Sequence, residues 1–254
     1  MIWQAVATLG VLVHFLVSGT AAQAEPRRIL IYGDSNSWGY EARSDGGPTN
    51  RFPPHRRWTG IVQRALGPDY IVIEDGLNLR TTDLDGENWA GSVMRPDTVN
   101  GARHLPVSIA ANMPLDLVVI MLGTNDLQAR YRRTPRQIAE AAISLARMVQ
   151  ASAGGIGTQY RAPKVLIVSP VQVSTIPIEE WRSRYAGSRE KSLGFATAFK
   201  EAADAAHIPV LDAAAAIGGA AHGADGIHLS ASDHRKLAAA ILPAIRQAIG
   251  VRRP

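Results

Sequence analysis

Short apolar runs alternate along this chain with longer amphipathic runs, and this alternation constrains the fold more than any other feature. Buried strands are predicted at residues 29–32, 70–74, 117–122, 165–169 and 209–212. Helices are predicted most clearly at residues 134–152, 188–207 and 230–249, the first of them with Pro135 in its first turn. Strands that alternate with helices indicate an α/β fold, in which right-handed crossovers build a parallel sheet that helices cover on both faces.

The first 24 residues have the pattern of a secretory signal peptide. They contain no Lys, Arg, Asp or Glu, are mostly apolar from residue 5 to residue 17, and end in Ala22-Gln23-Ala24 ahead of Glu25. We therefore predict cleavage after Ala24, a secreted or periplasmic location, and a mature domain of residues 25–254 with no integral membrane span. Because no basic side chain precedes the apolar run, an uncleaved membrane anchor stays an alternative.

The composition excludes several kinds of chemistry. The chain has no cysteine, which rules out disulfides, Cys-ligated zinc and thiol catalysis. Its seven histidines show no helical His-x-x-x-His or Glu-x-x-His spacing, so neither a metal nor another cofactor is predicted. The net charge of +5 is compatible with an acidic substrate or an anionic polymer, but the arginines are spread along the chain without interleaved aromatic residues. We expect a solvated basic surface and no nucleic-acid partner.

A serine follows the first predicted strand directly. The segment Gly33-Asp34-Ser35 comes after the apolar run 29–32, and in an open parallel sheet ligands bind at the carboxyl ends of the strands. Ser35 is therefore a candidate nucleophile at a strand-to-helix turn. The alternative from these residues alone is that Ser35 only caps the following helix, because Asp and Ser are preferred N-cap residues.

Two later segments supply the other groups that a serine nucleophile needs. Asp225 and His228 lie three residues apart before the last predicted helix, so one loop can hold a base and its orienting carboxylate; Asp233 and His234 compete for the same roles. Asn125 follows the third predicted strand, where its amide can donate to an oxyanion. Each segment alone is also typical of a turn or a helix cap. Together, in this order, they favour acyl-transfer chemistry.

With these motifs the chain resembles the SGNH (GDSL) hydrolase family from Arg28 onward, and segments 51–60, 74–82 and 131–135 resemble its arylesterase and acyltransferase branch. The resemblance implies an α/β, three-layer flavodoxin-like fold with a five-stranded parallel sheet in the order 2-1-3-4-5. It implies a triad of Ser35, Asp225 and His228. It also implies an oxyanion hole formed by the N–H groups of Ser35 and Leu79 and the side chain of Asn125.

Two positions depart from the family pattern. Asn36 follows the serine where the family has leucine, and Leu79 stands where the family has glycine. Any residue except proline supplies a backbone N–H, so Leu79 can still be a donor, although leucine does not readily adopt the positive φ that glycine tolerates. The alternative is that Leu79 packs as an apolar loop residue and that Gly76 has the special conformation.

The motifs and the resemblance together predict a serine esterase for small aryl or alkyl esters, with water or an alcohol as acyl acceptor. Trp38, about one helical turn after Ser35, is predicted to wall the substrate pocket. Residues 40–54 show no strand or helix period and are a candidate lid or subunit contact, which leaves a homo-oligomer open. The alternatives are a non-catalytic envelope protein that binds acylated carbohydrate or cell-wall polymer, and a flavin or nucleotide binder. The lack of a phosphate-binding loop after the first strand disfavours the latter.

Overall fold

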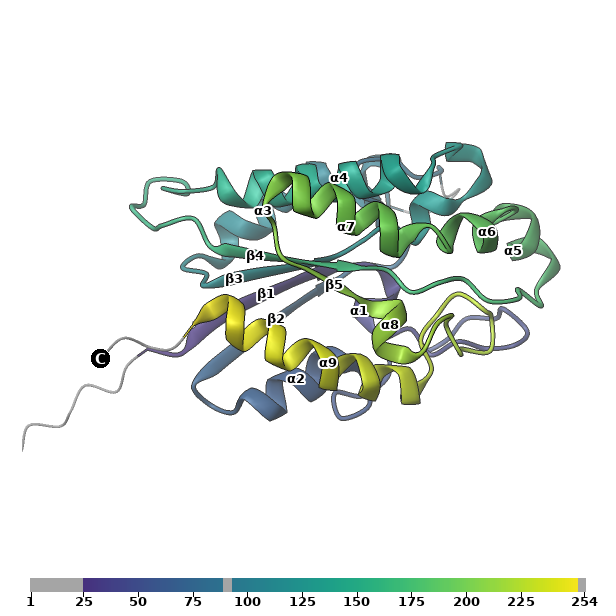
Figure 1. Cartoon of the computed structure of the whole chain (residues 1–254), viewed down its shortest axis with the longest axis horizontal. Helices are drawn as coiled ribbons and strands as arrows, with labels where there is room; N and C mark the ends of the chain where they lie inside the picture. Colours follow the sequence, from purple (N-terminus) through teal and green to yellow (C-terminus); the bar gives the residue numbers. More distant parts are fainter. Residues whose placement is uncertain (1–24, 89–92, 251–254) are drawn as a thin grey trace, which may run out of the picture.

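Five strands form one parallel sheet in the order β2-β1-β3-β4-β5 (Figure 1). The structure, a computed structural model, describes residues 25–88 and 93–250, so the predicted signal peptide lies outside the described residues. The strands are β1 (Arg27–Gly33), β2 (Tyr70–Gly76), β3 (Leu117–Met121), β4 (Lys164–Ser169) and β5 (Val210–Asp212). The predicted parallel sheet and its strand order are confirmed.

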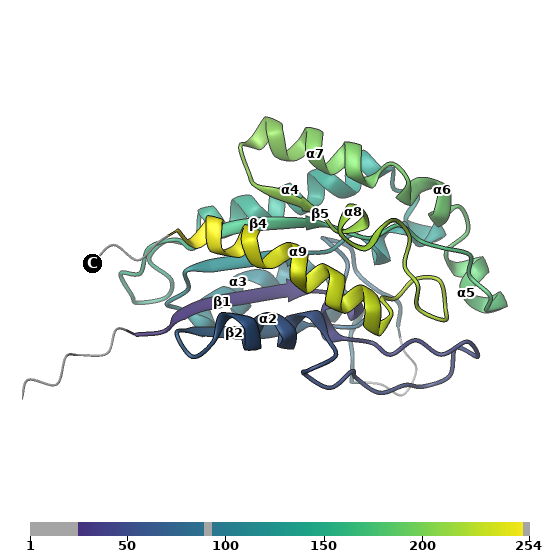
Figure 2. The same cartoon turned by 60° about the horizontal axis from the view of Figure 1, so that its bottom comes forward.

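Helices cover both faces of the sheet, which gives the predicted three layers (Figures 1 and 2). One face packs against α3, α4 and α7, and the other against α2, α8 and α9. The helices are α1 (Ser35–Trp38), α2 (Trp58–Leu66), α3 (Gly101–Asn112), α4 (Pro135–Gln150), α5 (Glu179–Arg184), α6 (Ser188–Ser192), α7 (Phe195–Ala206), α8 (Ala213–Ile217) and α9 (Ala231–Ile249). Within residues 25–88 and 93–250, none of them is long and apolar enough to cross a membrane.

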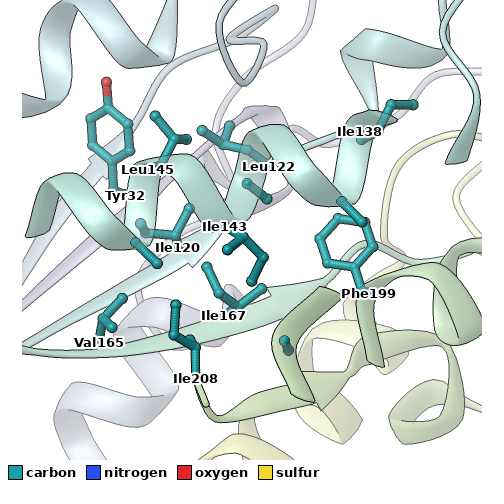
Figure 3. Close-up of a cluster of buried hydrophobic side chains, with 14 of the residues drawn as sticks. Tyr32, Ile120, Leu122, Ile138, Ile143, Leu145, Val165, Ile167, Phe199 and Ile208 are labelled. Atoms are coloured by element: carbon teal, nitrogen blue, oxygen red, sulfur yellow. The ribbon is translucent and has the colours of Figure 1, made fainter. Parts of the chain in front are cut away.

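Alternate residues of the central strands enter two separate cores, which is why these strands are apolar throughout. In β1, Leu30 and Tyr32 pack toward α3 and α4, whereas Ile29 and Ile31 pack toward α2 and α9. Figure 3 shows the first of these cores, with Phe199 of α7 among its members. These five side chains are fully buried, and burying one of this kind contributes about 1.5–3 kcal/mol. The sheet is thus held from both sides.

Several helical segments differ from the sequence-based expectation, and two of them have a clear physical reason. The predicted helix 188–207 is divided into α6 and α7 at Leu193 and Gly194; glycine disfavours helix by about 1 kcal/mol relative to alanine. Helix α3 was not predicted, because Pro106 interrupts its pattern. The buried side chains of Leu105 and Ile109 hold α3 on the sheet despite this proline.

The first three strands end level with one another. Gly33 at the end of β1 pairs with Gly76 of β2 on one side and with Met121 of β3 on the other. Residues that follow these strands therefore emerge side by side at one edge of the sheet. The loop before α9 and the segment around α5 reach the same end of the molecule (Figure 1).

Candidate active site

Ser35 begins a one-turn helix that is separated from β1 by the single residue Asp34. Asp34 is the N-cap of this helix, and its Oδ1 accepts a hydrogen bond from the Asn36 N–H at 2.9 Å. Because Asp34 does the capping, the Ser35 hydroxyl is available for another partner. The turn is tight: a Cβ at Gly33 would lie 2.2 Å from Ser37 Oγ, so only glycine fits there.

The structure brings Ser35, His228 and Asp225 into one hydrogen-bonded chain. His228 Nε2 lies 2.8 Å from Ser35 Oγ, and His228 Nδ1 lies 2.6 Å from Asp225 Oδ2. The second carboxylate oxygen, Asp225 Oδ1, accepts the backbone N–H groups of Ile227 and His228, each at 2.9 Å. This geometry leaves His228 Nε2 to take the serine proton, while the Asp225 carboxylate fixes the ring.

The Asp225 carboxylate is held in its charged form. Burial by itself would raise its pKa, but the hydrogen bond and charge of His228, together with the two backbone N–H groups, outweigh burial and lower the pKa. Asp225 is therefore ionised at neutral pH and can stabilise an imidazolium next to it.

Two aromatic side chains hold the imidazole ring of His228. Tyr40 stacks on it, with ring centroids 4.3 Å apart and planes 26° apart, and Trp181 approaches edge-on at 6.1 Å. Tyr40 comes from the irregular segment after α1 and Trp181 from α5. Sequence reasoning missed both, because neither lies in a motif.

Asn36 joins the nucleophile turn to the histidine loop, which explains why this chain departs from leucine at that position. Its Oδ1 accepts the Leu229 N–H at 2.9 Å, and its Nδ2 donates to the Ile227 carbonyl at 3.5 Å. These two residues flank His228 in the chain. An aliphatic side chain at position 36 would leave both backbone groups without these partners.

The backbone at Leu79 is in the left-handed region, with φ of 65°. Leucine thus adopts the conformation for which glycine was expected, and Gly76 lies in β2 without a positive φ. Leu79 lines the cavity in front of Ser35. Among the described residues, no acceptor takes the N–H of Leu79 or of Ser35. Both N–H groups are therefore free to bind a ligand oxygen.

The side chain of Asn125 is oriented by two direct hydrogen-bond partners. Its Nδ2 donates to the Arg80 carbonyl at 3.0 Å, and its Oδ1 accepts the hydroxyl of Tyr185 at 2.8 Å. Tyr185 in turn accepts from Gln128 Nε2 at 3.4 Å. Because the Arg80 carbonyl can only accept, it fixes which end of the amide is the nitrogen, and the second Nδ2 hydrogen is left to donate into the cavity that Asn125 lines.

The cavity in front of Ser35 has a volume of about 240 Å³. Besides Ser35, His228, Leu79 and Asn125, it is lined by Tyr40, Asn78, Trp181, Arg184, Tyr185 and Ile227. Trp38 is not among the lining residues, so its prediction as a pocket wall is corrected. Its ring contacts the Arg51 guanidinium, 5.6 Å from the ring centroid, and faces Tyr40. Gly39 has a left-handed conformation and turns the chain after Trp38. The aromatic ring that packs beside the catalytic candidates is therefore that of Tyr40, which stacks on His228.

Asp233 and His234 do not compete for the site. Asp233 closes a capping box with Ser230 at the start of α9 and accepts from the ring of His222 at 2.8 Å. The Nδ1 atom of His234 accepts the Trp58 N–H at 3.2 Å. Both residues therefore have structural partners away from Ser35.

The carboxyl group of Asp126, the residue after Asn125, is fully buried. Asp126 accepts hydrogen bonds from the N–H and hydroxyl of Thr82, three residues after Leu79. Burial raises the pKa of Asp126 to about 6, although the Thr82 bonds and the nearby Arg133 oppose the rise. Asp126 thereby ties the turn after β3 to the turn that carries Leu79.

A second, larger cavity of about 760 Å³ lies between the carboxyl-terminal parts of α3 and α4. Its lining is almost entirely apolar, with exposed Val107 and Ile156 at its surface. Among its lining residues, Ser152 is the one with a hydroxyl and none is titratable.

Comparisons with known proteins agree with this arrangement. The model of the GDSL-like lipase/acylhydrolase family matches residues 31–236. An aryl esterase from M. smegmatis is 41% identical, with 87% of this chain and 99% of that chain covered and a TM-score of 0.81. Est24, a carbohydrate acetylesterase from Sinorhizobium meliloti, is 39% identical, with the same coverage and a TM-score of 0.80. No curated protein matches the chain.

The sheet order and the match to these neighbours define an SGNH-type hydrolase with an α/β fold. The chain belongs to the GDSL-like lipase/acylhydrolase family, since that family's model covers most of it. It is thus a member of a family of carboxylic ester hydrolases, as the resemblance in its sequence implied.

Proposed function

We propose that this protein is a secreted serine esterase that acts on small acyl esters through an acyl-enzyme. The observation that carries the proposal is the hydrogen-bonded chain from Ser35 Oγ through His228 to Asp225, which opens on a cavity. A non-catalytic binding protein on the same fold would not need this chain of hydrogen bonds.

In the first half of the reaction, His228 takes the proton of Ser35 as the serine oxygen attacks the ester carbonyl. The negative charge that develops on the carbonyl oxygen is stabilised by the N–H groups of Ser35 and Leu79 and by Asn125 Nδ2. His228 then gives its proton to the departing alcohol or phenol, and the acyl group remains on Ser35. In the second half, water or an alcohol attacks the acyl-enzyme in the same way.

The size and the lining of the cavity favour substrates with short acyl chains and acyl acceptors that are relatively apolar. Its volume of about 240 Å³ is below the ~300–1,000 Å³ of pockets for drug-sized ligands, which favours acetyl and similar groups. The side chains of Tyr40, Trp181 and Ile227 make much of the wall apolar, so an alcohol can compete with water for the acyl-enzyme. The neighbours described as an aryl esterase and a carbohydrate acetylesterase suggest aryl acetates and acetylated sugars as first substrates.

A panel of p-nitrophenyl esters from acetate to palmitate, with and without added alcohol, tests the proposal. We expect the shortest esters to be cleaved fastest and a transesterification product to form when alcohol is present. An organophosphonate should label Ser35, and Ser35→Ala should abolish both labelling and hydrolysis. Labelling of the neighbouring Ser37 instead would refute the assignment of the nucleophile. Hydrolysis without transesterification would refute the use of alcohols as acyl acceptors and leave the esterase activity standing.

The proposal includes export and removal of the predicted signal peptide. Ala22-Gln23-Ala24 offers small residues at the expected cleavage site. Mass spectrometry of protein from the cell envelope or medium should therefore give Glu25 as the first residue. Intact residues 1–24 in a membrane fraction would support the membrane anchor instead.

A further inference from the structure

We propose that Arg184 is an anion-recognition residue of the cavity, so that the preferred substrates are esters carrying a carboxylate or similar anionic group beside the scissile bond. This inference rests on the proposed esterase function and deepens it. Arg184 is the last residue of α5 and lines the same cavity as Ser35 and His228.

The guanidinium of Arg184 has only distant ion-pair partners within the described part of the protein. It approaches Glu87 at 3.6 Å and Glu180 at 3.9 Å, which is too far for direct hydrogen bonds. Across the described part of the chain it donates no hydrogen bond. By contrast, Arg182 on the same helix is 2.6 Å from Glu179. A guanidinium has five N–H donors, so those of Arg184 remain available to a ligand.

The negative charge near Arg184 is already shared. Glu87 lies 2.9 Å from Arg130, closer than it lies to Arg184, so one carboxylate faces two guanidinium groups. Glu180, whose side chain is 79% exposed, is directed largely to solvent. Arg184 lines the cavity, whereas neither Glu87 nor Glu180 does, so the charge that faces a bound ligand on this side is positive.

Arg184 is also partly withdrawn from water, since its side chain is 31% exposed. A charge-assisted hydrogen bond to a carboxylate is stronger in such a place than on a fully solvated surface. Tyr40, Trp181 and Tyr185 supply an apolar wall but offer no positive charge. Arg184 is thus the side chain in the lining that distinguishes an anionic substrate from a neutral one of the same shape.

Matched pairs of esters test this inference. One pair places the charge on the leaving group, 4-acetoxybenzoate against 4-acetoxybenzamide, and the other places it on the acyl group, phenyl hydrogen adipate against its terminal amide. For wild type, Arg184→Gln, Arg184→Lys and Arg184→Glu, the ratio of kcat/KM for the charged ester to kcat/KM for the neutral ester is measured. Comparing this ratio between variants cancels the intrinsic reactivity of each ester.

We expect Arg184→Gln to lower the ratio by about tenfold in one of the two pairs, the effect of one charge-assisted hydrogen bond. Arg184→Lys should retain part of the preference, and Arg184→Glu should lower the ratio further. The wild-type preference should shrink as salt is added. The pair that responds identifies whether the anion belongs to the acyl group or to the leaving group.

Arg182→Gln is the matched control, because it removes the same charge from the same helix outside the cavity. An equal effect of Arg182→Gln, or an unchanged ratio in Arg184→Gln for both pairs, would overturn the inference and leave the esterase function standing. If the wild type cleaved none of the four esters while folded, the esterase proposal itself would fail.

Discussion

The hydroxyl of Tyr185 donates a hydrogen bond to Asn125 Oδ1 at 2.8 Å and, together with the Arg80 carbonyl that accepts from Nδ2, orients the amide. Tyr185 is buried, and burial raises the pKa of its hydroxyl, so it stays protonated and acts as a donor. The residue that stabilises the oxyanion in our mechanism is therefore positioned by another side chain sixty residues further along the chain.

Tyr185→Phe should lower kcat about tenfold, because the Asn125 amide loses the bond that orients it. KM for a neutral ester should change less. In an Asn125→Ala background the same change should have little further effect on kcat, since nothing remains to be oriented. Steady-state kinetics on the four proteins of this double-mutant cycle measure the coupling. Additive losses would show that Tyr185 acts independently of Asn125.

Asn125→Ala should lower kcat by about 10²- to 10³-fold, or roughly 2.7–4 kcal/mol, because an oxyanion donor acts on charge that appears in the transition state. Leu79→Ala should cost far less, since alanine keeps the backbone N–H. Both variants are compared by kcat and by thermal unfolding. A normal kcat in a destabilised Asn125→Ala protein would indicate a packing role, and an equal loss at Leu79 would mean that its side chain shapes the pocket.

Asp225→Asn should fold and yet lose about 10⁴-fold in kcat, because an amide in place of the carboxylate favours the wrong tautomer of His228. The amide oxygen of the substituted side chain can still accept the two backbone N–H groups that Asp225 Oδ1 accepts. Asp233→Asn serves as the control: it alters the capping box of α9, and we expect it to retain activity. Loss of activity in Asp233→Asn with a tolerant Asp225 would mean that the wrong pair has been assigned.

The stability of the fold should depend on the protonation of His234. Burial lowers its pKa from 6.5 to about 3, against the attraction of Asp233. Between these values the unfolded chain binds more protons than the folded one, so this contribution is present above pH 6.5 and is lost as the pH falls, by up to about 1.4 kcal/mol per pH unit.

His234→Gln removes this titration and keeps an acceptor for the Trp58 N–H. The free energies of unfolding of wild type and variant, measured with urea at several pH values, should therefore converge as the pH falls from 7 to 4. A constant difference across this range would contradict the pKa assigned to His234.

The sheet was predictable because its central strands are buried on both faces and so appear in the sequence as continuous apolar runs. Ser35, Asn125 and the pair Asp225 and His228 could be named as candidates, since each follows a strand or precedes a helix with a motif around it, and the structure brings them together at one cavity. Position in the chain and residue type together located these groups at one edge of the sheet.

Contacts between distant segments could not be predicted in this way. Tyr40 and Trp181 meet at His228 only in the folded chain, and the left-handed turn at Gly39 moves Trp38 off the cavity. The conformation of Leu79 also ran against its intrinsic preference, because the surrounding structure imposes a φ of 65°. Tertiary packing decided each of these features.

The amide of Asn36 has a consequence for how the site opens. Because it holds the backbone on both sides of His228 to the turn of Ser35, the histidine loop cannot detach without breaking bonds at the nucleophile. The two segments should therefore exchange their amide hydrogens with solvent as one cooperative unit, with the Leu229 amide as its reporter. Nucleophile and base, although 193 residues apart, then lose their alignment together or not at all.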